Sequence, residues 1–299
     1  MEMIIVGSVA FDSIETPYGK KEKLLGGSAV YASLAASLRT NPGIVGVVGE
    51  DFEDAHYDFL KSKNVDTSGV VKDKGNTFNW GGKYEEDMAQ AYTLHTHLNV
   101  FEDFNPKIND DYKKAGYLFL ANIDPPLQLA VLNQMTDLKF VLLDTMNLWI
   151  DIKKEELLNV VKKVNAISIN DTEARQLSGE WNLIKAGTIL QEIGPELVLI
   201  KKGENGTIVF YKNNYFIAPG YPTTATTDPT GAGDSFAGGF LSYLAKENTV
   251  DFETIKKATV WGNMIASFTV EGFGVEKLKT LTQEDISKRI DDFKKMISF

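Results

Sequence analysis

The amino-acid sequence predicts an α/β fold built on a mostly parallel sheet, and three observations support it. Short apolar runs alternate with longer segments that have helical periodicity. Most of the runs are apolar throughout, which is typical of strands that helices cover on both faces. The repeated order strand, helix, strand favours βαβ units, in which neighbouring strands run parallel.

The apolar runs give the expected strands, which are Met3–Val6, Gly43–Val48, Tyr117–Leu120, Phe140–Leu143, Ala166–Ile169, Leu197–Ile200 and Thr207–Tyr211. The segments between them have helical periodicity and are expected to be helices. These helices are Ser28–Leu38, Phe52–Lys63, Pro126–Met135, Lys154–Val164, Asp171–Leu177, Asn182–Glu192, Asp234–Ala245, Asp251–Val270 and Gln283–Met296.

Two segments, about 10–25 and 76–99, depart from this alternation. Both have the character of exposed strands and turns: Tyr92–Asn99 alternates in strand fashion, and Gly81-Gly82 indicates a tight turn. We expect them to form a small β-sheet lid beside the functional site. No internal repeat and no linker is evident, so we expect one domain over residues 1–299.

The bulk composition excludes several classes of function. The 299 residues carry a formal net charge of -10, which disfavours nucleic acid as a partner because a phosphate backbone requires a basic face. The chain has no cysteine, so disulfides and thiolate chemistry are excluded. It also lacks a signal-peptide pattern and any apolar run of membrane-spanning length, so we expect a cytoplasmic protein without a membrane partner.

The most informative segment is Asp-Pro-Thr-Gly-Ala-Gly-Asp at residues 228–234. Gly231 and Gly233 flank one small residue and lead directly into an expected helix. Such a turn can direct several backbone N–H groups at one point, and the helix dipole adds positive character there. Asp234 lies next to this anion cradle, where a carboxylate can accept a proton from an attacking hydroxyl. The pattern therefore favours phosphoryl transfer, although a capped, glycine-rich helix start without chemistry is the alternative.

Two better-known phosphate motifs do not fit the sequence. The dinucleotide fingerprint needs a third glycine where Phe236 stands, which disfavours a NAD-dependent dehydrogenase. A Walker A motif needs Gly-Lys followed by Ser or Thr, but Gly19-Lys20 is followed by Lys and Gly82-Lys83 by Tyr.

The run from Asp228 to Phe240 resembles the C-terminal signature of the PfkB/ribokinase family of carbohydrate kinases. This resemblance implies a ribokinase-like, doubly wound fold with helices on both faces of the sheet and a small β lid. It also implies that Asp234 is the catalytic base and that the backbone amides of Gly231, Ala232 and Gly233 form the anion hole.

The same resemblance implies that a monovalent cation such as K⁺ binds near Asp228 and Thr230. Family lids often pair between subunits, so a homodimer formed through the lid is also expected.

A second glycine-rich turn, Gly26-Gly27, opens the helix that begins at Ser28 and resembles the family's N-terminal signature. The resemblance implies that both glycines and Asp12 contact the acceptor, since a carboxylate pairs well with adjacent hydroxyl groups. Tyr31 stands where sugar kinases often have Asn, so a different or larger acceptor is possible. Asn147 follows a central strand and is expected to face the acceptor or the phosphates.

Asn170-Asp171-Thr172-Glu173 resembles the family's Asn-x-x-Glu motif, which organises Mg²⁺ and water near the nucleotide. Hard oxygen ligands of this kind suit Mg²⁺, with Glu173 acting mostly through water. By itself the tetrapeptide is equally compatible with a helix cap. The remaining nucleotide contacts that the resemblance implies are Lys202 (with Lys201 as its alternative), Gly203, Gly206, Asn263 and Gly272.

Together these features predict an ATP- and Mg²⁺-dependent kinase that phosphorylates a hydroxyl of a small molecule. A sugar is the leading acceptor, and a nucleoside, as in an adenosine-like kinase, is the close rival. A kinase-fold ligand sensor without turnover is the alternative from another class, although Asp234 and its anion turn are intact.

Overall fold

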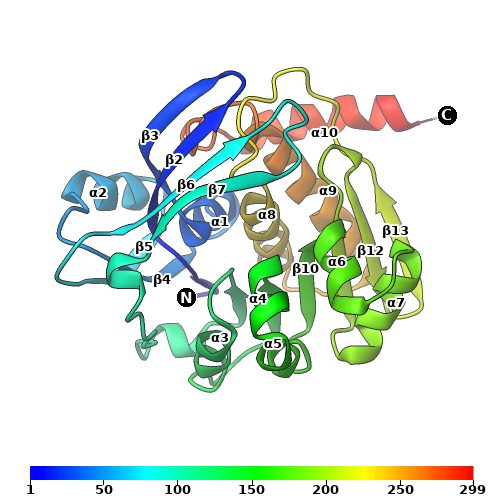
Figure 1. Ribbon diagram of the computed structural model, residues 1–299. Helices are drawn as coiled ribbons and strands as arrows, with labels where there is room; N and C mark the ends of the chain where they lie inside the picture. Colours follow the sequence, from blue (N-terminus) through cyan, green and yellow to red (C-terminus); the bar gives the residue numbers. More distant parts are fainter. Residues whose placement is uncertain (299) are drawn as a thin grey trace.

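A computed structural model describes residues 1–298. Within them the main sheet has nine strands in the order β13-β12-β11-β10-β9-β8-β1-β4-β5 (Figure 1). All neighbours pair in parallel except β11 with β12 and β12 with β13, so β12 alone runs opposite to the other strands. The strands are β1 (Met3–Val6), β4 (Gly43–Val48), β5 (Asp66–Lys72), β8 (Tyr117–Leu120), β9 (Phe140–Asp144), β10 (Ala166–Asn170), β11 (Leu197–Lys201), β12 (Thr207–Tyr211) and β13 (Asn214–Ala218).

Helices cover both faces of this sheet, as the sequence predicted (Figure 1). Alternate side chains of the central strands enter the two layers: Met3 and Ile5 pack on one side, Ile4 and Val6 on the other. One layer contains α1 (Ser28–Ala36), α2 (Asp54–Ser62), α8 (Ala232–Glu247), α9 (Phe252–Thr269) and α10 (Gln283–Ile297). The other contains α3 (Pro125–Leu132), α4 (Asn147–Ile152), α5 (Lys154–Val161), α6 (Asp171–Ser178) and α7 (Leu183–Ile193).

A separate small sheet forms the predicted lid, in the order β3-β2-β6-β7. Its strands are β2 (Ala10–Thr16), β3 (Gly19–Gly26), β6 (Phe78–Tyr84) and β7 (Ala91–His97). The two hairpin pairs are antiparallel, and β2 joins β6 in parallel. The segments that broke the strand–helix alternation therefore lie side by side although about 60 residues separate them along the chain.

The sequence did not predict β5, β13 or α4. The two strands lie at the edges of the main sheet and each buries only one residue, so they lack a continuous apolar run. The helix α4 is only one or two turns long, which leaves little periodicity to detect. The short 3₁₀ helices Asn99–Phe101, Tyr112–Lys114 and Gly203–Asn205 complete the secondary structure.

The chain reverses its direction of winding beside β1, because β4 pairs on one side of this strand and β8 on the other. In doubly wound folds, ligands bind at the carboxyl ends of the strands near such a point. Three strands end there on a polar residue, namely Asp144, Asn170 and Lys201.

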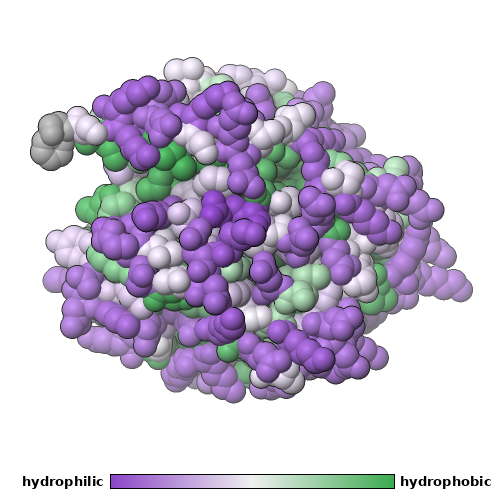
Figure 2. Space-filling view, turned by 180° about the vertical axis from the view of Figure 1, so that it is seen from behind, coloured by the Kyte–Doolittle hydropathy of each residue, from purple (hydrophilic) through white to green (hydrophobic). Residues whose placement is uncertain are grey.

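The face of the molecule turned away from the viewer in Figure 1 is mainly hydrophilic, with scattered hydrophobic areas (Figure 2). Among the described residues, no helix combines the length and the apolar character that crossing a membrane requires.

Candidate active site

The glycine-rich turn at residues 231–233 forms the start of α8, which begins two residues earlier than predicted. Gly231 is the N-cap and has φ 75°, a left-handed conformation that glycine adopts without strain. The ring of Tyr31 occupies the space where a side chain at 231 would lie, since an added Cβ would come within 2.2 Å of it. Position 231 therefore has to be a glycine, and the turn presents the first amides of a 16-residue helix to one point.

Asp234 lies in the first turn of α8, beside these amides. Burial raises the pKa of its carboxyl group to about 7, and the negative charge of Asp144 acts in the same direction while Lys201 opposes it. The side chain is half-buried and so keeps access to the open site. A carboxyl group with this pKa is suited to accept a proton near neutral pH.

Lys201 brings a positive charge to the anion turn. Its Nζ lies 2.7 Å from Oδ2 of Asp144, and an added Cβ at Gly233 would be 3.2 Å from the same nitrogen. The pKa of Lys201 is raised because Asp144, Glu173 and Asp234 outweigh the effect of its burial. This lysine thus links the carboxyl ends of β11 and β9 to the start of α8.

Asn170 and Glu173 form a reciprocal capping box at the start of α6. The Asn170 amide donates to Oε2 of Glu173, and the Glu173 amide donates to Oδ1 of Asn170, both at 2.8 Å. Burial raises the pKa of Glu173 to about 7, with Lys201 opposing the shift and Asp144 adding to it. The tetrapeptide therefore forms a helix cap, and the charge of Lys201 at the anion turn also acts on its glutamate.

Asp12 lies at the other end of the site, on lid strand β2, and is 4% exposed. The Gly27 amide donates to its carboxylate, and the Tyr31 hydroxyl lies 3.4 Å from its Oδ2. An added Cβ at Gly26 would approach this oxygen to 2.0 Å, so the carboxylate rests directly on the glycine. Burial raises the pKa of Asp12 to about 7, and the charge of Asp228 contributes to the shift.

Asp228 is fully buried and fixes the loop that precedes the anion turn. Its Oδ1 accepts from the Thr230 amide at 2.9 Å and its Oδ2 from the Gly274 amide at 2.8 Å. The Thr230 hydroxyl in turn donates to the hydroxyl of Tyr84 on the lid, at 3.2 Å. The lid and the two loops therefore meet at one point next to Gly231.

Comparison with known proteins agrees with this geometry. Residues 4–281 match the profile of the pfkB family carbohydrate kinases. The chain belongs to this family. Members of the PfkB family are phosphotransferases that act on hydroxyl groups of sugars or nucleosides, so the chain is a kinase of this kind.

Individual PfkB relatives differ in their acceptors. The chain is 30% identical over 249 residues to a cytidine kinase of Thermococcus kodakarensis, covering 81% of this chain and 88% of the relative. It is 24% identical over 284 residues to a nucleoside kinase of Methanocaldococcus jannaschii, covering 88% and 84%. A crystal structure of Vibrio cholerae fructokinase with fructose, ADP and a calcium ion has the same fold, with a TM-score of 0.80, 20% identity and coverage of 96% and 98%.

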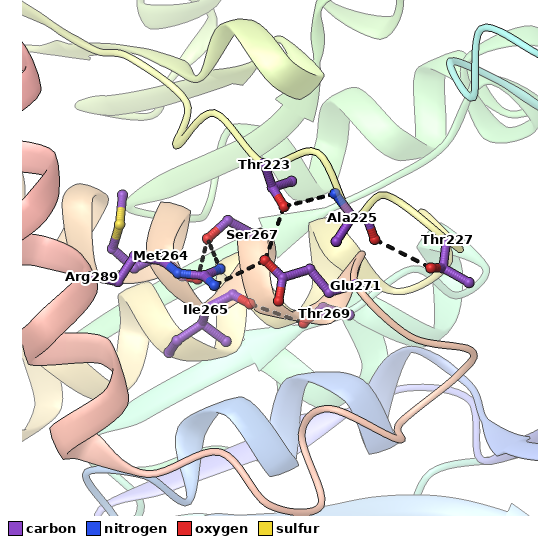
Figure 3. Close-up of polar contacts among 9 residues, drawn as sticks. All are labelled: Thr223, Ala225, Thr227, Met264, Ile265, Ser267, Thr269, Glu271 and Arg289. Atoms are coloured by element: carbon purple, nitrogen blue, oxygen red, sulfur yellow. Dashed lines mark hydrogen bonds and ion pairs between the residues drawn. The ribbon is translucent and has the colours of Figure 1, made fainter.

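In this PfkB kinase an ion pair between two partly exposed side chains supports the loop before the anion turn (Figure 3). The Glu271 carboxylate accepts from the Thr223 hydroxyl at 3.0 Å and pairs with the Arg289 guanidinium of α10 at 2.9 Å. The guanidinium also donates to the Ser267 hydroxyl at 2.9 Å and stacks 3.3 Å from the ring centre of Phe268. We name this set the Glu271–Arg289 clamp.

The clamp acts on the segment that carries Asp228. The amides of Thr227 and Asp228 donate to the carbonyl of Val270, the residue next to Glu271, at 2.7 and 3.2 Å. The loop at 219–231 is thereby fixed to the end of α9 and to the C-terminal helix. Nothing in the local sequence signals the pair, because 18 positions separate its two residues along the chain and neither lies in a motif.

Several PfkB site residues expected from the sequence lie away from Asp234. Asn147 is exposed in the first turn of α4. Lys202 is half-buried, and within residues 1–298 its side chain makes no hydrogen bond or ion pair, whereas Lys201 reaches the anion turn. A lysine at the end of a strand is the sequence feature that points to this site. That feature does not tell whether Lys201 or Lys202 reaches the anion turn.

The other expected nucleotide contacts lie along the edge formed by β12, β13 and α9. Asn263 is buried and accepts from the Thr207 hydroxyl at 2.8 Å, so its side chain supports β12. Gly206 packs against the backbone of Ala218, Gly203 borders open space, and an added Cβ at Gly272 would lie 3.0 Å from Lys277.

Proposed function

We propose that this PfkB-family kinase transfers the γ-phosphoryl group of ATP to a ribose hydroxyl of a nucleoside. The observation that carries the proposal is the placement of Asp12 and Asp234, two carboxyl groups with pKa raised to about 7, on either side of the anion turn. Relatives with the names cytidine kinase and nucleoside kinase support a nucleoside as the acceptor. Although the sequence favoured a sugar, it also left a nucleoside open on the evidence of Tyr31.

Each residue has a defined role in this proposal. Asp12 accepts hydrogen bonds from two neighbouring ribose hydroxyls and so fixes the acceptor. Asp234, in its ionised form, takes the proton from the attacking hydroxyl. The amides of Gly231, Ala232 and Gly233, together with the charge of Lys201, stabilise negative charge on the transferred group.

The residues present fit the cofactors that the proposal requires. Bound ATP supplies the phosphoryl group and bound Mg²⁺ neutralises phosphate charge. The described residues contain no cluster of three or more acidic or histidine ligands, and Mg²⁺ at phosphates needs only one or two carboxylates besides water. Glu173 with Asn170 would hold the metal through water, and the turn at 231–233, whose largest side chain is the methyl group of Ala232, would let phosphate approach its backbone amides.

A K⁺ site beside Asp228 and Thr230 is also part of the proposal. Asn147 is proposed to contact the acceptor. The proposed contacts to ATP are Lys202, Gly203, Gly206, Asn263 and Gly272. Since both Asp228 oxygens accept backbone amides, this carboxylate would act mainly by shaping the loop around the ion. Turnover measured in K⁺ against Na⁺ at equal ionic strength tests it, and equal rates would contradict it.

Dimerisation through the lid and a cytoplasmic location remain predictions. The lid carries the exposed apolar residues Tyr18, Tyr92 and Leu94, which a partner's lid would cover. Sedimentation analysis of the protein and of a Leu94→Asp variant tests the dimer, since the variant should dissociate.

ADP release with Mg-ATP over a panel of nucleosides and sugars tests the proposed function. We expect turnover with cytidine or another nucleoside that exceeds turnover with ribose or fructose. Turnover with free sugars alone would favour the second candidate, a sugar kinase, to which the fold of the fructokinase points. Tight binding of an acceptor without any turnover would instead favour a ligand sensor.

A further inference from the structure

Trp80 lies on the lid beside Asp12, although no motif marks it. The residues Asp12 of β2 and Trp80 of β6 are direct partners in a regular parallel register, and Ile14 and Gly82 are the next partners on the same face. Directly paired residues of neighbouring strands send their side chains to the same side of the sheet. Trp80 and the acceptor-facing carboxylate therefore share one face of the lid.

The contacts of this lid face show that it looks toward the active site. Asp12 contacts Tyr31, Ile14 packs with Phe273, and the hydroxyl of Tyr84 meets Thr230. Along β6 the inward positions are Trp80, Gly82 and Tyr84, and Tyr84 lies over the loop that carries the anion turn. Trp80 is at the opposite end of this row, next to Asp12 and thus at the acceptor end of the site.

The indole ring of Trp80 is held flat against the lid. An added Cβ at Gly82 would come within 2.2 Å of the ring, so the ring lies over the glycine along the strand. The indole N–H points to the Thr93 hydroxyl of β7, 3.4 Å away. Trp80 is nevertheless only half-buried, whereas Trp261 in the core is 4% exposed. A fixed aromatic ring with uncovered area thus lies on the strand next to the acceptor carboxylate and on the same face of the lid.

We propose that Trp80 is the stacking platform for the nucleobase of the acceptor and makes the kinase prefer a nucleoside to a free sugar. The proposal rests on the proposed nucleoside kinase activity and assigns the residue that recognises the base. With the ribose hydroxyls on Asp12, the base would extend across about one strand spacing, roughly 4.8 Å, to the ring on β6. Stacking accepts any base because every base has a π-face, so this contact selects the class of acceptor and not one member of it.

The test compares Trp80→Leu, which removes the aromatic face, with Trp80→Phe, which keeps one. The acceptors are cytidine and methyl β-D-ribofuranoside, a ribose without a base. We expect Trp80→Leu to raise KM for cytidine roughly 5- to 100-fold, the range that loss of one base–aromatic stack produces, and to leave kcat/KM for the methyl riboside unchanged. Trp80→Phe should recover most of the cytidine affinity. Trp181→Leu, at an 81% exposed tryptophan, is the control and should behave as wild type.

A binding measurement provides a second readout that does not depend on turnover. Cytidine should quench tryptophan emission of the wild-type protein, and the quenching should be absent in Trp80→Phe, which still binds cytidine in calorimetry. Thermal unfolding of all variants checks that the lid remains folded.

Two outcomes would overturn the stacking role of Trp80 while leaving the nucleoside kinase activity intact. The first is an unchanged KM for cytidine in Trp80→Leu. The second is an equal loss of kcat/KM for cytidine and the methyl riboside, which would indicate a structural role of Trp80 in the lid. If the wild type phosphorylates sugars but no nucleoside, the proposed function and the platform fail together.

Discussion

Asp234 lies where the helix start, the buried carboxylates and the opening of the site meet. Its carboxyl group has to be ionised to accept a proton, yet burial and the charge of Asp144 hold its pKa at about 7. Lys201 opposes this shift, and a cation at the site would act in the same direction. If Asp234 is the base, as we propose, its ionised fraction at neutral pH depends on a balance of charges that is close to even.

Replacement of Asp234 by Asn should lower kcat by about 10²- to 10⁴-fold, the range for loss of a general base, while binding of ATP and acceptor is retained. In the wild type, kcat/KM should rise with pH through about 7, because the base must lose its proton. Steady-state kinetics from pH 5.5 to 9 and calorimetric titration of the variant check both expectations. Near-wild-type turnover of the variant would eliminate Asp234 as the base.

The residue Lys201 is surrounded by carboxyl groups, so its removal has consequences for stability as well as for activity. Lys201→Met leaves Asp144 without its partner in a buried site, and breaking such a pair costs about 3–5 kcal/mol of unfolding free energy. The double variant Lys201→Met/Asp144→Asn should recover most of this stability but not the turnover, since the charge at the anion turn is still missing.

Denaturant unfolding and ADP release of the two single variants and the double variant measure this cycle. Recovered turnover in the double variant would show that Lys201 only compensates Asp144. Lys202→Met, one position along the chain, is the matched control and should have a smaller effect on both quantities.

The elements around the site have to be held in the correct positions for these charges to act on a substrate. The loop at 219–231 has no regular secondary structure up to the start of α8. The Glu271–Arg289 clamp holds it from outside (Figure 3), and Asp228 within it accepts from the Gly274 amide. The guanidinium contributes a fork of donors and a flat face, so it joins Glu271, Ser267 and Phe268 at once.

Arg289→Met should destabilise the protein by about 1–3 kcal/mol, because the partly exposed Glu271 carboxylate then loses a charged hydrogen-bond partner. The unfolding free energy of Arg289→Lys should fall between those of Arg289→Met and the wild type, since lysine restores the charge but not the forked hydrogen bonds or the stacking. If the clamp positions the anion turn, kcat should fall in both variants at temperatures well below their unfolding transitions. Full activity of the folded variants would limit the clamp to a stabilising role.

Three acidic side chains of the molecule lie in surroundings that disfavour their ionised form. Asp12, Glu173 and Asp234 each have a pKa raised to about 7. A group of this kind contributes stability that is fully present below its unfolded pKa and is lost as the pH rises through the folded value. The ligand-free protein should therefore lose the contribution of these groups between about pH 4 and pH 7.

Asp12→Asn isolates this effect, because an amide retains an acceptor for Gly27 but does not ionise. The shift from 3.8 to about 7 corresponds to about 4 kcal/mol, so the variant should unfold at higher temperature than the wild type at pH 8, with the gap closing toward pH 4. Calorimetric melting over this pH range measures the gap. Asp103→Asn, at an exposed carboxylate, is the control, and an equal gap for both variants would contradict the prediction.

The printed sequence was sufficient for the alternation of strands and helices, the separate lid, the family and the phosphoryl-transfer chemistry. These features depend on local patterns: apolar runs mark covered strands, and a glycine-rich turn beside an aspartate marks an anion site. The edge strands β5 and β13 were not predicted, because strands exposed to solvent carry no such run.

Which side chains of the site become neighbours could be learned only from the tertiary structure. It brought Lys201 to Asp144 across 57 positions, placed Tyr84 of the lid on Thr230, and paired Trp80 with Asp12. Neighbours along a strand point to opposite faces, so the difference between Lys201 and Lys202 depends on the register of the sheet. Charge, burial and stacking act through distances in space, and distances between remote segments exist only after the sheet and the lid have formed.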